Sequence, residues 1–231
     1  MGASALINLH THTRYSDGDH LPDDVVRSAY SAGLRAVGIS DHFMTSKVPS
    51  PLTKEEFPRY LRHLRSLGAM YEGKMRVLAG VEIDANRQRG RLDELPFEML
   101  DQLDFVLFEY AEDPSQNGIS LRELGAIRRK ISAPCGLCHW DMDRIFQDAA
   151  PEALAETLHA LDLFVEVSTS DYYTREGLHF YELGERFFHA FRGQVKVSIG
   201  TDSHRRLSEV GNIGRGVEFV ERLGLLDQLV I

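Results

Sequence analysis

Short apolar runs alternate with amphipathic segments along the whole chain. Seven runs are short and apolar enough to predict strands, over residues 5–9, 35–40, 76–84, 105–108, 135–138, 163–167 and 195–199. Apolar residues at helical spacing predict helices after Pro22, Glu56, Ser120 and Pro151, and over residues 178–191 and 213–223. Strands that alternate with helices in this way are typical of a parallel sheet with right-handed crossovers.

Two of the predicted helices begin with a capping pattern. Thr53 precedes Glu56 by three residues, and Ser120 precedes Glu123 by three. In such a pair the hydroxyl accepts a backbone N–H of the first turn, and the glutamate returns a bond to the capping residue. Both pairs therefore predict helix starts.

The polar residues that follow the predicted strands decide between an open sheet and a closed barrel. Seven of them stand at strand carboxyl ends: His10, His12, His42, Glu82, His139, Asp202 and His204. An open sheet would spread these side chains along one edge, whereas a barrel brings them to one mouth. We therefore predict an α/β fold with a seven-stranded barrel that spans residues 1–231 as one domain.

The stretch around the first strand carries half of a metal site. His10 and His12 are two residues apart, so on an extended strand both imidazoles point to the same side. Asp17 follows in a turn with Ser16 and Gly18, which places a carboxylate at the tip of that turn.

The number and type of candidate ligands predict the metals. A mixture of imidazole and carboxylate suits Zn, Mn or Fe, and one tetrahedral ion takes only four ligands. The chain offers more than four, so we expect two or three divalent ions, with Glu82 bridging two of them. Four other histidines lie within helical patterns and are predicted to be structural or on the surface, and His20 stays unassigned; the four are His63, His159, His179 and His189.

Composition narrows the class of protein. The 231 residues are 43% hydrophobic and carry a net charge of −9, which argues against an extended nucleic-acid-binding surface. No apolar run approaches the roughly 20 residues of a membrane helix. With two cysteines and no leader-like segment, a cytoplasmic protein with reduced thiols is expected.

Residues 135–139 read C-x-x-C-H, which is also the pattern of covalent haem attachment. On a strand, Cys135 and Cys138 point to opposite faces, so neither a disulfide nor a shared metal is natural. We therefore favour the interpretation that both cysteines are small buried residues on a strand that ends at His139.

The ordered motifs resemble those of the polymerase and histidinol phosphatase (PHP) family of metal-dependent phosphoesterases. They are H-T-H-T-R-Y-S-D-G at 10–18, G-I-S-D-H at 38–42, G-V-E at 80–82, His139, and G-T-D-S-H at 200–204. Residues 139–144 also match the H-x-D-x-x-R pattern of the histidinol phosphatase branch. The resemblance implies a distorted seven-stranded α/β barrel.

The resemblance also implies a set of ligands for each metal. One ion would be held by His10, His12, Glu82 and Asp202, a second by Glu82 and His139, and a third by Asp17, His42 and His204. The sequence departs from the family at the fourth strand, where the usual histidine ligand is replaced by Ala111. Glu109, two residues earlier on the same face, is the candidate replacement, so the second site is remodelled, weakly filled or absent.

These residues predict hydrolysis of a small phosphoric monoester, such as histidinol phosphate or a nucleotide-like metabolite, by metal-activated hydroxide. Arg14, Arg175 and Arg205 are candidates to bind the phosphate, and either Asp17 or His204 to protonate the leaving group. Two alternatives remain: a phosphodiesterase or exonuclease acting on short oligonucleotides, and a metal-binding module with weakened catalysis. The oligomeric state is left open.

Overall fold

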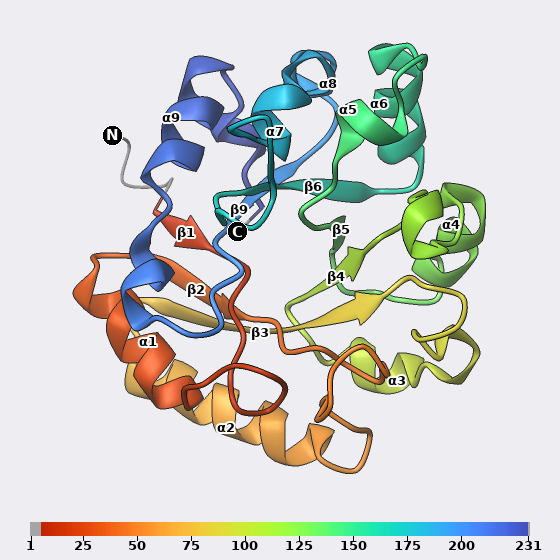
Figure 1. Ribbon diagram of the computed structural model, residues 1–231. Coiled ribbons are helices and arrows are strands. Elements are labelled where there is room, and N and C mark those ends of the chain that lie inside the picture. The colour runs from red at the N-terminus through yellow and green to blue at the C-terminus, as the bar shows by residue number, and fades with distance from the viewer. Residues whose placement is uncertain (1–5, 231) are drawn as a thin grey trace.

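The computed structural model describes residues 6–230, and seven parallel strands form its centre (Figure 1). Their order in the sheet follows the chain, with neighbours hydrogen-bonded in parallel throughout. The strands are β1 (Ile7–Asn8), β2 (Ala36–Ile39), β3 (Arg76–Asp84), β4 (Phe105–Glu109), β5 (Cys135–Leu137), β6 (Leu163–Ser168) and β9 (Val197–Gly200). The predicted strands are thus confirmed, except that residue 5 lies outside the described residues.

The sheet curls until its first and last strands meet. The Leu9 N–H donates to the Ile199 carbonyl at 2.8 Å, and the Asp202 N–H donates to the His10 carbonyl at 2.9 Å. Thr11 then pairs with Ser203 in parallel. The predicted barrel is therefore nearly closed, and the seam joins the two segments that carry His10, His12, Asp202 and His204.

Helices lie around the outside of the strands (Figure 1). The longer ones are α1 (Pro22–Ser31), α2 (Phe57–Met70), α4 (Leu121–Arg128), α6 (Pro151–Ala160), α8 (Glu185–Phe191) and α9 (Gly214–Arg222). The short ones are α3 (Phe97–Leu100), α5 (Met142–Ile145) and α7 (Phe180–Leu183), and 3₁₀ turns occur at Leu92–Glu94, Pro114–Gln116, Leu207–Gly211 and Leu226–Gln228. No helix among residues 6–230 has the combination of length and apolarity that crossing a bilayer requires.

The core has two apolar layers. The larger one, the outer core layer, lies between the strands and the helices. The smaller one, the inner cluster, includes Leu9, Leu107 and Cys138, together with the rings of Phe105 and Phe164. A methyl group on Gly80 would lie 2.3 Å from the Phe105 ring, so this cluster is packed against bare backbone.

The helix starts follow the capping patterns only in part. Ser120 and Glu123 form a complete capping box at the start of α4. Thr53 and Glu56 bond to each other, but α2 begins at Phe57 and its N-cap has no side-chain bond. The Thr53–Glu56 pair therefore stabilises the turn before α2 and not the first turn of α2 itself.

The helix predicted over residues 178–191 is wrong in its first part. The segment folds as α7 and α8 with Gly184 between them, preceded by a hairpin of β7 (Thr174–Arg175) and β8 (Leu178–His179). Glu176 and Gly177 turn the hairpin with positive φ angles of 57° and 82°. His179 is thus the N-cap of α7 and bonds Glu182.

Candidate metal centre

The carboxyl ends of the strands bring the predicted polar residues together in one buried region. Four groups of ligand atoms lie there, each with all its atoms within 4.8 Å of one another. The groups are His10–His12–Asp202; His12–Asp17–His42–His204; His10–Glu82–Cys138–His139; and His42–Glu82–Glu109. Because they share members, they form one continuous centre.

The first group joins the two sides of the barrel seam. The Nε2 atoms of His10 and His12 lie 3.0 Å apart. Asp202 Oδ1 lies 3.2 Å from the first of these nitrogens and 3.0 Å from the second. The carboxylate of Glu82 is 3.5 Å from each. Three strands thus direct two imidazoles and two carboxylates toward one point.

The second group is organised by Asp17. Its Oδ1 lies 3.3 Å from His204 Nε2 and 3.7 Å from His12 Nδ1, and its Oδ2 lies 3.9 Å from His42 Nε2. The His204 ring stacks on the His12 ring with 4.0 Å between centroids. Asp17 therefore crosses the mouth from the loop after β1, in the arrangement that the family resemblance implies.

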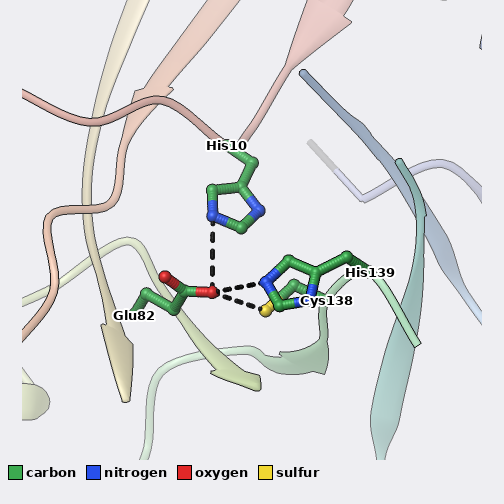
Figure 2. Close-up of side chains that lie close together, drawn as sticks. All are labelled: His10, Glu82, Cys138 and His139. Carbon is green, nitrogen blue, oxygen red and sulfur yellow. Dashed lines mark hydrogen bonds and ion pairs between the residues drawn. The ribbon is translucent and has the colours of Figure 1, made fainter. Parts of the chain in front are cut away.

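The third group is centred on Glu82 (Figure 2). Its Oε1 accepts from His139 Nε2 at 2.9 Å and from Cys138 Sγ at 3.0 Å. Cys135 lies in the outer core layer while Cys138 lies in the inner cluster, so the two do point to opposite faces. The contact of Cys138 with Glu82 was missed, because the sequence analysis treated both cysteines as packing residues.

Beside the fourth group lies a lysine that no sequence pattern predicted. His42 Nδ1 lies 2.9 Å from Glu82 Oε2 and 3.7 Å from Glu109 Oε1. Lys47, from the loop after β2, places its Nζ 2.6 Å from Glu109 Oε2. No spacing pattern marked Lys47, because it belongs to an irregular loop.

Ala111 does not lie where a ligand would. It is buried in the outer core layer, and its carbonyl accepts from Trp140 Nε1 at 2.6 Å. Glu109 is the β4 residue that faces His139, with 3.8 Å between Oε2 and Nε2. Glu112 points elsewhere and accepts the Leu121 N–H.

Hydrogen bonds behind the candidate ligands orient the imidazoles. Glu166 accepts from His10 Nδ1 at 2.9 Å through one oxygen and from the His139 backbone N–H at 2.8 Å through the other. His204 Nδ1 donates to the Asp202 carbonyl at 2.9 Å. A proton held on Nδ1 leaves the Nε2 lone pair free, which is the usual arrangement of a metal-binding histidine.

Tyr173 completes the wall of the centre. Its hydroxyl donates to Asp202 Oδ2 at 2.8 Å, and its ring stacks on His139 with centroids 4.0 Å apart. No sequence pattern marked Tyr173, because it lies in the irregular loop that leads to the β7–β8 hairpin. Tyr173 thus contacts one residue that follows β5 and one that follows β9.

The backbone is strained at two candidate ligands. His139 and Asp202 have φ angles of 36° and 47°. Such left-handed conformations cost about 1–3 kcal/mol in a non-glycine residue and persist only where the surroundings enforce them. The fold therefore holds both residues at the mouth against a local preference.

Burial and neighbouring charges shift the pKa values in opposite directions. Burial lowers the pKa of His12 to about 3, and the nearby His204 and His42 add to this effect. Burial also acts on His10, but the carboxylates of Glu166, Asp202 and Glu82 outweigh it and raise its pKa. Burial would raise the pKa of Glu82, yet His42 and His10 hold it well below its usual range.

Several buried polar atoms of the centre make no hydrogen bond of acceptable geometry, although two of them, His42 Nδ1 and Glu82 Oε2, lie 2.9 Å apart. They are His12 Nδ1, His42 Nδ1, Glu82 Oε2, Glu109 Oε1 and Asp202 Oδ1. Buried polar groups are rarely left unpaired, because each costs about 1–3 kcal/mol. Nitrogen and oxygen donors that converge without partners fit a divalent metal such as Zn, Mn or Fe.

The three predicted arginines differ in position. Arg14 and Arg205 are exposed, and Arg14 Nε donates to the Asp19 carbonyl at 2.8 Å. Arg175 is half-buried and places one guanidinium nitrogen 2.8 Å from Asp143 Oδ2 and its Nε 3.5 Å from Asp141 Oδ2.

The other histidines lie outside the four groups. His63 contacts Asp23, His159 bonds the Gln194 carbonyl, and His189 is exposed. His20 bonds the Arg205 carbonyl at 2.9 Å. These positions agree with the structural or surface roles predicted for the histidines of the helical segments.

Sequence comparison decides the family. A model of the PHP domain matches residues 8–189. The chain belongs to the PHP family. It therefore has the PHP phosphoesterase fold, a distorted (β/α)7 barrel, with buried His, Glu and Asp clusters at the mouth. A search of curated proteins finds no match to this PHP chain.

Solved structures resemble the PHP chain over nearly its whole length. Histidinol phosphate phosphatase from Lactococcus lactis, complexed with Zn, L-histidinol and phosphate, has 16% identity and a TM-score of 0.64, covering 96% of this chain and 94% of its own. A putative histidinol phosphatase from Listeria monocytogenes has 17% identity and a TM-score of 0.61, covering 92% and 98%. An aldolase has 11% identity and a TM-score of 0.51, covering 96% and 97%. These likenesses show the barrel, which different chemistries share.

Proposed function

We propose that this PHP chain is a metal-dependent phosphatase that hydrolyses phosphoric monoesters of small metabolites. The observation that carries the proposal is the convergence of buried, unpartnered nitrogen and oxygen atoms at one mouth. The ions held there would polarise the phosphoryl oxygens and supply hydroxide at neutral pH.

The residues of the chain position the metals and the substrate. His10, His12, Glu82 and Asp202 would hold one ion, with Glu166 and Tyr173 fixing the orientation of His10 and Asp202. His139 and Cys138 contact the Glu82 oxygen that His10 also approaches, so they restrain that carboxylate (Figure 2). His42 joins this part of the centre to Asp17 and His204.

Asp17 and His204 are the members of the centre that a substrate reaches most readily. Their side chains are 28% and 21% exposed, whereas those of His10, His12 and Glu82 are at most 1% exposed. In the metal-free chain, burial lowers the pKa of His204, but the hydrogen bond to Asp17 and the carboxylates of Asp202 and Asp17 outweigh this and raise the pKa to about 9. We assign proton delivery to the leaving group to this pair.

A phosphate group needs cationic partners beyond the metals. Of the three predicted arginines Arg175 is the one that is half-buried, and its Nε makes no hydrogen bond although it lies 3.5 Å from Asp141 Oδ2. Arg14 and Arg205 follow β1 and β9, which adjoin at the seam. We assign phosphate binding to Arg175, with Arg14 and Arg205 at the rim.

Two observations favour a small monoester over an oligonucleotide. The net charge of −9 opposes a long polyanion. The Lactococcus lactis relative binds L-histidinol and phosphate, which makes histidinol phosphate the first substrate to assay.

The test is a phosphate-release assay on metal-free protein after separate addition of Zn, Mn and Fe. The panel contains histidinol phosphate, nucleoside monophosphates and a short single-stranded oligonucleotide. We expect turnover of a monoester that His10→Ala abolishes and that His63→Ala, a histidine outside the centre, leaves unchanged. Activity on the oligonucleotide alone would favour the phosphodiesterase alternative, and bound metal without any turnover would favour a metal-binding module.

A further inference from the structure

Lys47 extends into the metal centre from a loop that is held in place. Its backbone N–H donates to Thr45 Oγ1 at 3.0 Å, and that hydroxyl donates to Asp84 Oδ2 at 3.0 Å. The two residues before Thr45 are also fixed, because Phe43 pairs with Leu52 and Met44 donates to the Leu52 carbonyl. The Lys47 side chain is only 23% exposed. It is therefore not a mobile surface lysine.

The ammonium of Lys47 is surrounded by groups that bind a cation. Glu109 Oε2 lies 2.6 Å away, and the centroid of the Tyr110 ring lies 5.0 Å away. A cation near an aromatic face is attracted to its electrons, and the attraction grows as water is excluded. The lysine therefore keeps its charge inside the centre.

Glu109 needs this cation when no metal contacts it. Its side chain is fully buried, and its other oxygen, Oε1, has no hydrogen-bond partner. A buried carboxylate without a counter-charge costs several kcal/mol. Of the four ligand groups, the one with Glu109 is the one in which the structure shows an ammonium bound directly to a member.

We infer that Lys47 takes the place of a metal ion at the His42–Glu82–Glu109 group. The inference rests on the metal-binding part of the proposed function. An ammonium and a divalent cation compete for the same Glu109 oxygens, and their like charges repel at this separation. The ions of this chain are thus bound by the other groups, and Glu109 contacts none of them.

The test counts metal ions per chain. Wild-type protein, Lys47→Met and Lys47→Arg are each saturated with Zn or Mn, freed of excess metal, and analysed by inductively coupled plasma mass spectrometry. We expect Lys47→Met to bind one more ion than the wild type, because Glu109 is then free to act as a ligand. Lys47→Arg keeps a cation beside Glu109 and should match the wild type. The double variant Lys47→Met with Glu109→Gln should lose the extra ion.

An equal count in wild type and Lys47→Met would overturn the inference. No bound metal in either protein would instead contradict the proposed metal centre itself, so the two failures are distinguishable. Crystals of the wild type with Mn give a second measurement that does not need the variant to fold. We expect no anomalous peak within coordination distance of Glu109, and a peak there would also overturn the inference.

Discussion

The carboxylate of Glu166 bonds two strands of the barrel mouth at once. One oxygen fixes the His10 imidazole and the other accepts the His139 backbone N–H, whose residue has a strained backbone. Gly200 lies so close that a methyl group there would be 1.7 Å from Glu166 Oε1. Glu166 is thus a positioning residue. The neighbouring strand β9 leaves space for the Glu166 side chain only because residue 200 is a glycine.

Replacing Glu166 should weaken metal binding. Glu166→Gln adds an amide donor beside His10 Nδ1, which disturbs the tautomer that presents Nε2 to a metal. We expect the Zn dissociation constant to rise about 10- to 100-fold. Competition with a chromophoric chelator measures this, with Glu152→Gln, an exposed position on α6, as the matched control. Unchanged affinity in a folded Glu166→Gln protein would show that His10 is oriented by other contacts.

Tyr173 allows its hydroxyl and its ring to be tested separately. Tyr173→Phe removes the 2.8 Å bond to Asp202 but keeps the stacking on His139. A hydrogen bond to a charged group contributes about 1.5–3 kcal/mol, so we expect the free energy of unfolding of the metal-free chain to fall by that order. Urea denaturation measures the change, and Tyr172→Phe is the control because Tyr172 is 79% exposed. An equal, small effect of both changes would rule out a structural role for the Tyr173 hydroxyl.

At the scale of the elements, the strands depend on close approach between glycines and aromatic rings. A methyl group on Gly136 of β5 would lie 2.1 Å from the Phe164 ring of β6. That ring is 3% exposed and packed in the inner cluster, so it has little room to move. The φ angle of Gly136 is not positive, so the backbone conformation does not require a glycine there. The close packing between the strands does.

Gly136→Ala should therefore destabilise the barrel. Forcing an extra carbon into a packed core costs typically about 1–3 kcal/mol, and we expect a loss of this size or larger in the free energy of unfolding. Chemical denaturation measures it, with Gly214→Ala at the start of α9 as the control. A methyl group on Gly214 meets no atom within 4 Å, so that change should be neutral or slightly stabilising. Equal stability of both variants would show that the Phe164 ring adapts without cost.

At the scale of the whole molecule, the metal centre connects strands that are far apart in the sequence. His10 and His12 follow β1, Glu82 lies in β3, His139 follows β5, and Asp202 follows β9. Ions bound to these residues would hold the mouth of the barrel together across its seam. Without metals, the carboxylates gathered at the mouth repel one another. Bound ions would neutralise this repulsion and should therefore stabilise the entire fold.

Removing the metals should lower the melting temperature. At a metal concentration of about 100 times Kd, binding adds about 2.7 kcal/mol. In a chain of this length 1 kcal/mol corresponds to about 2–4 °C, so a strong chelator should lower Tm by about 5–11 °C. Differential scanning calorimetry measures the shift, and re-addition of Zn should reverse it. His10→Ala removes one of the proposed sites, so the chelator should lower its Tm by less than it lowers that of the wild type. An equal shift in both proteins would place the stabilising site elsewhere.

The sequence by itself determined the strands, their parallel arrangement and the positions of the candidate ligands at the strand ends. Period and length identify strands locally, and parallel strands in a closed barrel must bring their carboxyl ends together. For this reason His10, Glu82 and Asp202 could be assigned to one mouth from their positions alone, and the structure places them there.

Only the tertiary structure decided what surrounds those ligands. Lys47 and Tyr173 lie in irregular loops, and no periodicity states where such a loop crosses the mouth. Cys138, after β5, gained its contact with Glu82 of β3 because both strands pair with β4. Only the first two residues of the helix predicted over 178–191 belong to the β7–β8 hairpin. Strand positions follow from local patterns, whereas the cation beside Glu109 depends on how the loop after β2 folds over the end of β4.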